Sequence, residues 1–248
     1  MKLAFISDIH EDIVSLRLAI SMLEKYKPDK LICLGDICGF NPLYYKYLEQ
    51  RNAHECLSVI KQNCDVIIPG NHDYHASESL PEISPDFDFP SNWYELDYFQ
   101  KREIAKAKLW NYQRSELNPM LSHEDKQFLR NLKQFCRIET EMGRLLASHY
   151  IYPNLAGMEV SYCKTPTDYI PHFDFMVTHQ ANIAVAGHAH ASSLLCVTKQ
   201  KIHKAKFGKA CKLDEQMIIM CPPIARGAFK QGFLILDTKE KVARAIRI

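Results

Sequence analysis

Residues 2–10 read KLAFISDIH, a nearly continuous apolar run that meets Asp8 and then His10. Such a run is typical of a strand buried on both faces, as in a sheet covered by helices. The runs at 30–34 (KLICL) and 65–68 (DVII) have the same form. Each of these three predicted strands is followed at once by polar side chains.

A helix is predicted between the first two of these strands. Its apolar side chains recur with the spacing of one helix face over residues 13–26, at Ile13, Leu16, Ile20 and Leu23. Asp12 is a candidate cap for this helix, and a second helix is predicted near 53–62. Strands that alternate with helices indicate right-handed crossovers and a parallel sheet.

The middle of the chain predicts a loop and two helices. Residues 77–92 contain Pro81, Pro85 and Pro90 among acidic residues, which indicates a solvated loop, with a lid over a pocket as the alternative. A helix is expected near 93–112 with four inward side chains, Leu96, Phe99, Ile104 and Ala107. Another is expected to begin at Ser122.

The rest of the chain predicts mostly strands. In chain order they are expected at 144–148, 173–178, 183–186, 193–198, 201–207, 217–221, 232–237 and 242–248. The last five have few helical signals between them and predict a second, largely antiparallel sheet. We therefore expect one α/β domain over residues 1–248, with a largely helical insertion at about 74–143.

Composition and charge exclude several classes of protein. Hydrophobic residues make up 47% of the 248 residues, which is ample for a large core. A formal net charge of +2 does not support bulk binding to nucleic acid or to a membrane surface. The apolar runs are shorter than the roughly 18 residues of a spanning helix. Nine scattered cysteines predict reduced thiols and a cytoplasmic location.

Five short motifs carry side chains that can bind metal ions. They are Asp8-x-His10, Gly35-Asp36, Gly70-Asn71-His72-Asp73, the lone His149 and Gly187-His188-x-His190. Carboxylate, imidazole and amide ligands suit Mn, Fe, Zn or Mg. Residues two apart in an extended chain point to the same side, so we expect the first and last motifs each to grip metal from one segment.

The charges of these residues favour an anionic substrate. Two divalent ions carry more positive charge than Asp8 and Asp36 return, and the excess favours a phosphate and a hydroxide. Two ions about 3.5–4 Å apart can orient an ester, polarise its oxygens and supply hydroxide near neutral pH. His72 lies beside a ligand and is free to give a proton to the leaving oxygen, or alternatively to bind the phosphate.

Together the five motifs resemble the pattern of the calcineurin-like metallophosphoesterases, D-x-H, G-D, G-N-H-[DE], H and G-H-x-H, over residues 8–190. The resemblance implies a four-layer α/β/β/α sandwich of two mixed sheets with flanking helices. It also implies two divalent ions, with manganese favoured in vitro. The ligands that it implies for one ion are Asp8, His10, Asp36 and His190, and those for the other are Asp36, Asn71, His149 and His188.

The chain is most similar to the small bacterial and archaeal phosphodiesterase-type members of that family. Residues 35–42 (GDICGFNP) resemble their G-D-x-x-G-[YF]-x-P stretch and lack the arginine of the protein Ser/Thr phosphatases. Two departures stand out. Glu11-Asp12 replaces the frequent Gly-Asn and adds negative charge near the metals, and residues 222–227 (PPIARG) stand where relatives often carry N-P-G-S.

The sequence thus predicts hydrolysis of a small phosphomonoester or phosphodiester, with a nucleotide as one candidate. Asn71 and His72 are the expected substrate contacts, and His72 is the expected acid. The alternatives are a catalytically silent scaffold of the same fold and a protein Ser/Thr phosphatase. A nuclease would need a basic stripe, which the sequence lacks. The other histidines are assigned no chemistry, and the substrate and oligomeric state are left open.

Overall fold

The computed structural model describes residues 1–84, 86–213 and 215–248; Pro85, in the predicted loop, and Asp214 lie outside the described residues. Within these residues the strands form two six-stranded sheets. The first has the order β3-β2-β1-β11-β12-β9, and the second has the order β4-β5-β6-β10-β7-β8. Both contain parallel and antiparallel pairs, which confirms two mixed sheets.

The strand bounds follow the apolar runs closely. The first sheet contains β1 (Lys2–Ile6), β2 (Lys30–Cys33), β3 (Val66–Ile67), β9 (Cys211–Lys212), β11 (Gly232–Asp237) and β12 (Val242–Arg247). The second contains β4 (Phe135–Thr140), β5 (Gly143–Ser148), β6 (Ala181–Ala186), β7 (Leu194–Val197), β8 (Ile202–Ala205) and β10 (Met217–Met220).

The C-terminal strands divide between the two sheets, so the prediction that they form a second sheet by themselves is wrong. β11 pairs antiparallel with β1, from Lys2 opposite Asp237 to Phe5 opposite Leu234. β1 therefore lies inside the sheet, with β2 parallel on its other side. Only β7, β8 and β10 join β5 and β6. β11 pairs with the backbone N–H and C=O groups of β1 that would otherwise be unpaired at the edge of the parallel β1-β2-β3 unit.

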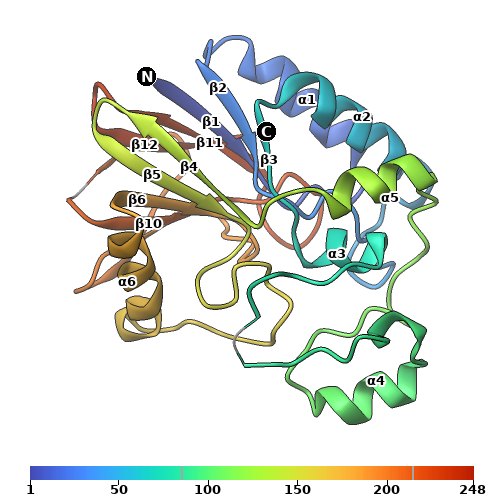
Figure 1. Cartoon of the computed structure of the whole chain (residues 1–248). Coiled ribbons are helices and arrows are strands. Elements are labelled where there is room, and N and C mark those ends of the chain that lie inside the picture. Colours follow the sequence, from blue (N-terminus) through green and yellow to red (C-terminus); the bar gives the residue numbers. More distant parts are fainter. Residues whose placement is uncertain (85, 214) are drawn as a thin grey trace.

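Helices cover the outer faces of both sheets (Figure 1). The α-helices are α1 (Ile13–Leu23), α2 (Ala53–Asn63), α3 (Asn71–Ser77), α4 (Tyr98–Ala105), α5 (His123–Arg130) and α6 (Ile170–Thr178). Short 3₁₀ turns occupy Leu48–Gln50, Trp93–Glu95 and Pro166–Tyr169. α1 and α2 pack on the first sheet, and α6 packs on the second. Each described helix is too short or too polar to span a bilayer.

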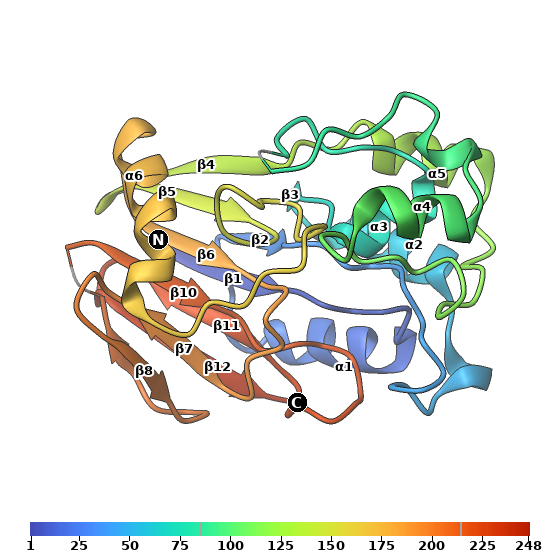
Figure 2. The ribbon, with the colours of Figure 1, turned by 90° about the horizontal axis from the view of Figure 1, so that it is seen from below.

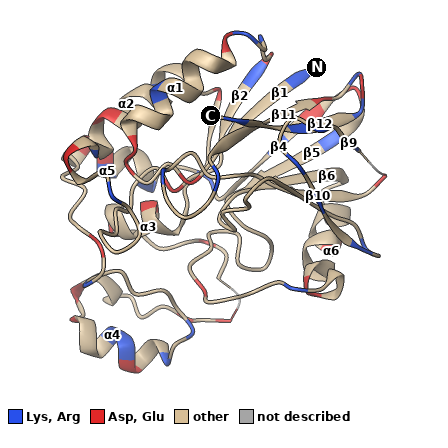
Figure 3. Ribbon diagram, turned by 180° about the vertical axis from the view of Figure 1, so that it is seen from behind, with Lys and Arg blue, Asp and Glu red and all other residues tan. Residues whose placement is uncertain are grey.

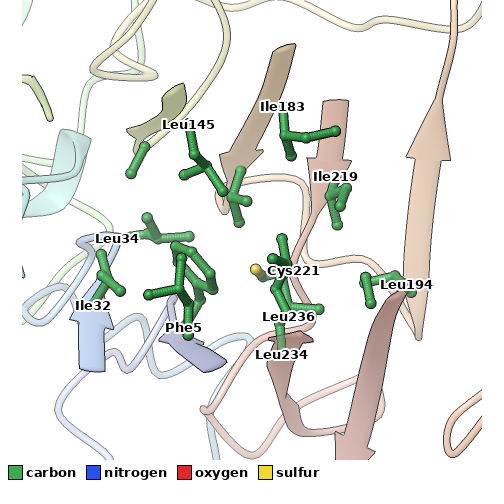
Figure 4. Close-up of a cluster of buried hydrophobic side chains, with 14 of the residues drawn as sticks. Phe5, Ile32, Leu34, Leu145, Ile183, Leu194, Ile219, Cys221, Leu234 and Leu236 are labelled. Carbon is green, nitrogen blue, oxygen red and sulfur yellow. The ribbon is translucent and has the colours of Figure 1, made fainter. Parts of the chain in front are cut away.

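The main core lies between the two sheets (Figure 4). Phe5 and Leu234 project from the first sheet, and Leu145, Ile183 and Ile219 project from the second. All five side chains are at most 5% exposed. This layer, with the two outer helical layers, gives the predicted α/β/β/α sandwich.

One predicted strand is a helix in the structure. Residues 173–178 (FDFMVT) belong to α6 and are not a strand. Pro171 stands in the first turn of this helix, where its missing N–H costs nothing. Phe173 and Met176, three residues apart, are buried on one face. The local β propensity of the segment is overridden by this packing.

The insertion is less helical than predicted. Of the expected helix near 93–112, only Trp93–Glu95 and α4 are helical. Asp97 caps α4, and Lys106 ends it in the left-handed conformation. Phe99, Ile104 and Ala107 are exposed, so the predicted inward position is wrong for these three side chains. It is confirmed for Leu96, which packs against the cluster around Trp93. Figures 1 and 2 both place α4 away from the sheets, on the side of α3 and opposite α6.

We predict that Phe5→Ala lowers the free energy of unfolding by about 3–5 kcal/mol, because it leaves a cavity between the sheets. Phe99→Ala is the matched control. It should cost less than about 1 kcal/mol, because the ring is exposed and its main contact is the Arg114 guanidinium. Urea unfolding curves measure both. Equal losses would show that Phe5 does not pack as described.

Candidate metal centre

All eight predicted site residues converge where the strands end. The Asp8 carboxylate lies 3.4 Å from the His190 imidazole, which lies 3.1 Å from His10. Nε2 of His149 lies 3.2 Å from Asp36 Oδ2, 3.1 Å from Asn71 Oδ1 and 3.2 Å from His188 Nδ1. His72 completes the cluster, with Nε2 at 3.8 Å from Asp36. Segments 180 residues apart are thus joined at one site.

The donor atoms form three overlapping groups. Two of them come together at Asp36, and the third, made of His10, Asp36 and His72, overlaps both. Asp8, His10 and His190 offer donors within 4.8 Å of one another. Asp36, His149 and His188 form a second such group, with Asn71 against His149. Asp36 Oδ2 also lies 3.9 Å from His10 in the first group. This division matches the two ligand sets that the family resemblance implies, with Asp36 between them.

The backbone of the centre is not extended, so the reason given for the pairing of Asp8 with His10 is wrong. Asp8, His10 and Asp36 have φ values of 54°, 46° and 53°, and His188 and His190 have values of 61° and 45°. These left-handed conformations cost roughly 1–2 kcal/mol each for residues with a Cβ. Such strain is tolerated where the surrounding structure fixes it, commonly at functional sites.

Backbone groups orient the imidazole rings. Nδ1 of His149 donates to the Leu34 carbonyl at 2.7 Å, and Nδ1 of His10 donates to the Gly39 carbonyl at 2.9 Å. Each ring therefore presents Nε2 to the centre. A metal-binding histidine commonly has its second nitrogen fixed in this way.

Asp73 holds the two loops that carry Asp36 and Asn71. Its Oδ1 accepts hydrogen bonds from the backbone of Ile37 and Cys38, and its Oδ2 accepts one from Gly70. The short side chain reaches both loops, which accounts for aspartate at this position. Gly70 is required by close approach, since a Cβ there would collide with Asp36.

The protonation states that bind cations are favoured at His10, His188 and Asp8. Burial and the neighbouring His72 lower the pKa of His10 to about 3, and burial and His149 lower that of His188 to about 3. Burial raises the pKa of Asp8, but His190 and His149 outweigh it and lower the pKa to about 2. Neutral imidazole and ionised carboxylate are the forms that coordinate metal. At His149 burial lowers the pKa, but the carboxylates of Asp36 and Asp8 outweigh it and raise the pKa to about 9, so this ring must lose a proton when an ion binds.

Two arginines neutralise the extra acidic residues after His10. Glu11 pairs with Arg51 at 2.8 Å and also accepts from the Gly39 backbone. Asp12 accepts from Arg226 Nε at 2.8 Å and Nη2 at 2.9 Å, a bidentate contact. Asp12 also caps α1, as predicted. Arg226 comes from the segment that replaces N-P-G-S, so the two departures from the family pattern contact each other.

A pocket of about 800 Å³ opens beside the centre. Much of its wall is aromatic, from Tyr44, Tyr45, Trp110, Tyr112, Tyr162 and Phe229. Among the described residues that line it, Lys164 is the sole lysine or arginine. The insertion contributes Trp110 and Tyr112.

Glu116 is the main site residue that the sequence did not reveal. Its carboxylate forms an ion pair with Nδ1 of His72 and is only 5% exposed. The Tyr112 ring also packs against His72, with the two ring centroids 4.2 Å apart. Gly39, with φ of 98°, gives the imidazole room, because a Cβ there would collide with it. No local motif marks Glu116, which lies 44 residues from its partner.

Comparison with known proteins places this arrangement in a family. The family model of calcineurin-like phosphoesterases matches residues 1–192. The chain therefore belongs to the calcineurin-like phosphoesterase family, whose members use divalent metal ions.

Two solved structures are similar to this chain in fold, and one further protein is similar in sequence. The structure of a metallophosphoesterase from Sphaerobacter thermophilus is similar, with a TM-score of 0.66, 19% identity and coverage of 100% of this chain and 88% of that one. A hypothetical protein from Pyrococcus horikoshii gives a TM-score of 0.58 at 14% identity, covering 100% and 87%. An uncharacterized Methanocaldococcus jannaschii protein is 28% identical over 148 residues, 59% of this chain. The matched part is 48% of that relative, so the match spans about half its length.

We predict that Asp36→Asn weakens both bound ions together, since Asp36 lies in reach of both donor groups. The affinity of the protein for each ion should fall by more than roughly 10–100-fold, which is the usual loss when a residue that only hydrogen-bonds to a ligand is replaced. Elemental analysis after gel filtration counts the ions per chain. Asp174→Asn, an exposed residue of α6, is the matched control and should retain them. Loss of a single ion would contradict the position of Asp36 between two sites.

Proposed function

We propose that this protein hydrolyses small phosphomonoesters or phosphodiesters with two divalent ions. The observation that supports this most directly is the set of donor groups that overlap at Asp36, with the His72 imidazole among them and a pocket beside the centre. The first ion would be held by Asp8, His10, Asp36 and His190. The second would be held by Asp36, Asn71, His149 and His188.

The donor set fits such ions. Oxygen and imidazole nitrogen donors suit Mn, Fe, Zn or Mg, and manganese is the ion of first choice in vitro. When bound, the ions supply the positive charge that polarises the ester and activates water at neutral pH. The protein would contribute the ligands, and Asn71 and His72, which line the pocket, would contact the phosphate.

His72 is proposed as the acid for the leaving group. Its Nδ1 is occupied by Glu116, and its Nε2 faces the centre. Burial lowers the pKa of His72, but the carboxylates of Glu116 and Asp36 outweigh it and raise the pKa to about 9. In the chain without ions the ring is then protonated near neutral pH. Bound ions would offset the charge of Asp36, and Glu116, which is not a proposed ligand, would remain the carboxylate that favours the protonated ring. As the P–O ester bond breaks, the proton on Nε2 passes to the departing oxygen.

The pocket favours an uncharged aromatic or apolar group on the alcohol side of the ester. Rings such as Tyr44, Trp110 and Tyr162 offer flat apolar surface, and a base or phenyl ring stacks on such surface. Lys164 alone adds positive charge beyond the ions and histidines among the described lining residues. This charge suits one phosphate better than a polyphosphate. A mononucleotide or an aryl ester meets both conditions.

Turnover of p-nitrophenyl phosphate and of its bis ester, each with added manganese, tests the proposal. We expect one or both to be hydrolysed, and the ratio gives the preference between mono- and diester. Absence of turnover in the metal-loaded protein would favour the silent scaffold. Turnover of phosphopeptides alone would favour a protein phosphatase. A screen of phosphorylated metabolites then narrows the substrate.

We predict that His72→Ala lowers turnover by about 10²–10⁴-fold while the ions stay bound. The loss should be larger for an alkyl ester than for a p-nitrophenyl ester, because p-nitrophenolate leaves without needing a proton. The matched control is His75→Ala, three residues further along α3, which should change turnover far less. Elemental analysis checks the metal. If His72→Ala loses metal, His72 is a ligand and not the acid.

Glu116→Gln should lower turnover by a smaller factor, roughly 10-fold or more, because the neutral amide no longer stabilises protonated His72. Metal content should be unchanged. The loss should again be larger for the alkyl ester, a pattern that a purely structural role would not produce. Equal losses with both esters would show that Glu116 does not act through His72.

A further inference from the structure

Three donor side chains outside the candidate metal centre converge between the edges of the two sheets. They are Cys196 on β7, His203 on β8 and Cys211 on β9. The two sulfurs lie 2.8 Å apart, and Nε2 of His203 lies 3.4 Å from Cys211 Sγ. All three donor atoms fall within 4.8 Å of one another.

The fold brings these residues together by two separate pairings. Cys196 and His203 are direct partners in the antiparallel β7-β8 ladder, so their side chains lie on the same face. Cys211 lies on β9, the edge strand of the other sheet, next to Ala243 of β12. Cys196 and Cys211 are both buried in the core between the sheets. The cluster therefore brings β9, at the edge of the first sheet, against β7 and β8, at the edge of the second.

The chemistry of the three donors suits a soft divalent ion. Thiolate and imidazole are the ligands that Zn²⁺ prefers. Two thiolates cancel the charge of one such ion, and a neutral imidazole adds none, so the complex carries no net charge. Neutrality is what a site this buried requires.

We propose that Cys196, His203 and Cys211 bind one thiophilic divalent ion, of the class of Zn²⁺, which fastens the two sheets together. Cys196 and Cys211 are buried, but His203 is only half-buried. Water can therefore reach the ion on the His203 side and complete its coordination. Tetrahedral coordination requires the sulfurs to separate by about 1 Å, a change within reach of side-chain rotation. Nδ1 of His203 is buried and has no hydrogen-bond partner. A hydrogen bond from that nitrogen is therefore not the reason for a histidine at this position.

A disulfide between Cys196 and Cys211 is the alternative to a bound ion. His203 distinguishes the two alternatives. A disulfide needs no imidazole beside it, whereas an ion uses all three donors. The candidate centre around Asp36 contains oxygen and nitrogen donors only. An ion bound through sulfur is therefore spectroscopically distinct from ions bound there.

Cobalt substitution of the reduced, full-length protein tests the proposal. We expect thiolate-to-cobalt charge-transfer absorption in the wild type, and its loss in Cys211→Ser. Cys136→Ser is the matched control, because Cys136 packs against the same core but outside the cluster, and it should keep the absorption. Asp36→Asn should also keep it, so failure here is distinguishable from failure of the proposed function.

His203→Ala provides a second measurement if the buried serine variants fail to fold. Competition with a chelator should show Zn²⁺ affinity at the sulfur site reduced by at least about tenfold. A reduced wild-type protein that binds no cobalt through sulfur overturns the proposal. So does absorption that survives in a folded Cys211→Ser variant, or conversion of Cys196 and Cys211 to a disulfide while Zn²⁺ is present in excess.

Discussion

The carboxylate and backbone of Asp36 connect the loops that make the centre. Its carbonyl accepts hydrogen bonds from the backbone of Ile9 and His10, which fixes the loop after β1. Its Oδ1 accepts from the backbone of His72 at 3.0 Å, and its Oδ2 faces His149. One residue at the end of β2 therefore sets the positions of the loops after β1 and β3 and of the loop after β5. The buried carboxylate is kept ionised by those same histidines, which hold its pKa well below the usual range although burial alone would raise it.

The centre could be predicted from sequence because its information is local. Each ligand lies within a few residues of a strand end, and parallel strands bring such ends to one edge. The chain order of Asp8, Asp36, Asn71 and His149 was therefore enough to predict their convergence. The reason given for the pairing within Asp8-x-His10 was wrong, since the backbone there is left-handed. The residue types in the motifs identify the candidate ligands. The strained backbone conformations that orient their side chains depend on hydrogen bonds between loops.

The parts that could not be predicted depend on distant contacts. Residues 173–178 have the composition of a strand, and the face of the second sheet makes them a helix instead. Phe99 was placed inward by its spacing, but the aromatic cluster around Trp93 forms the small core of the insertion without it. Glu116 is an ordinary surface-type residue in sequence, and only the fold places it against His72. In each case the contact that determines the structure is made with a residue far away in the sequence. A pattern of neighbouring residues contains no information about such a contact.

The charges around the centre give a physical reason for selectivity. Glu11 and Asp12 would repel a phosphate if they were free, but Arg51 and Arg226 hold both in ion pairs. Because these arginines are committed to carboxylates, neither offers its charge to a substrate. Figure 3 shows lysines and arginines interspersed with acidic residues along the ribbon. In the proposed enzyme, positive charge near the pocket would therefore come from the two ions, the histidines and Lys164. An electrostatic field confined to so small a region attracts a single phosphate strongly and a long polyanion weakly, which favours a small ester over a nucleic acid.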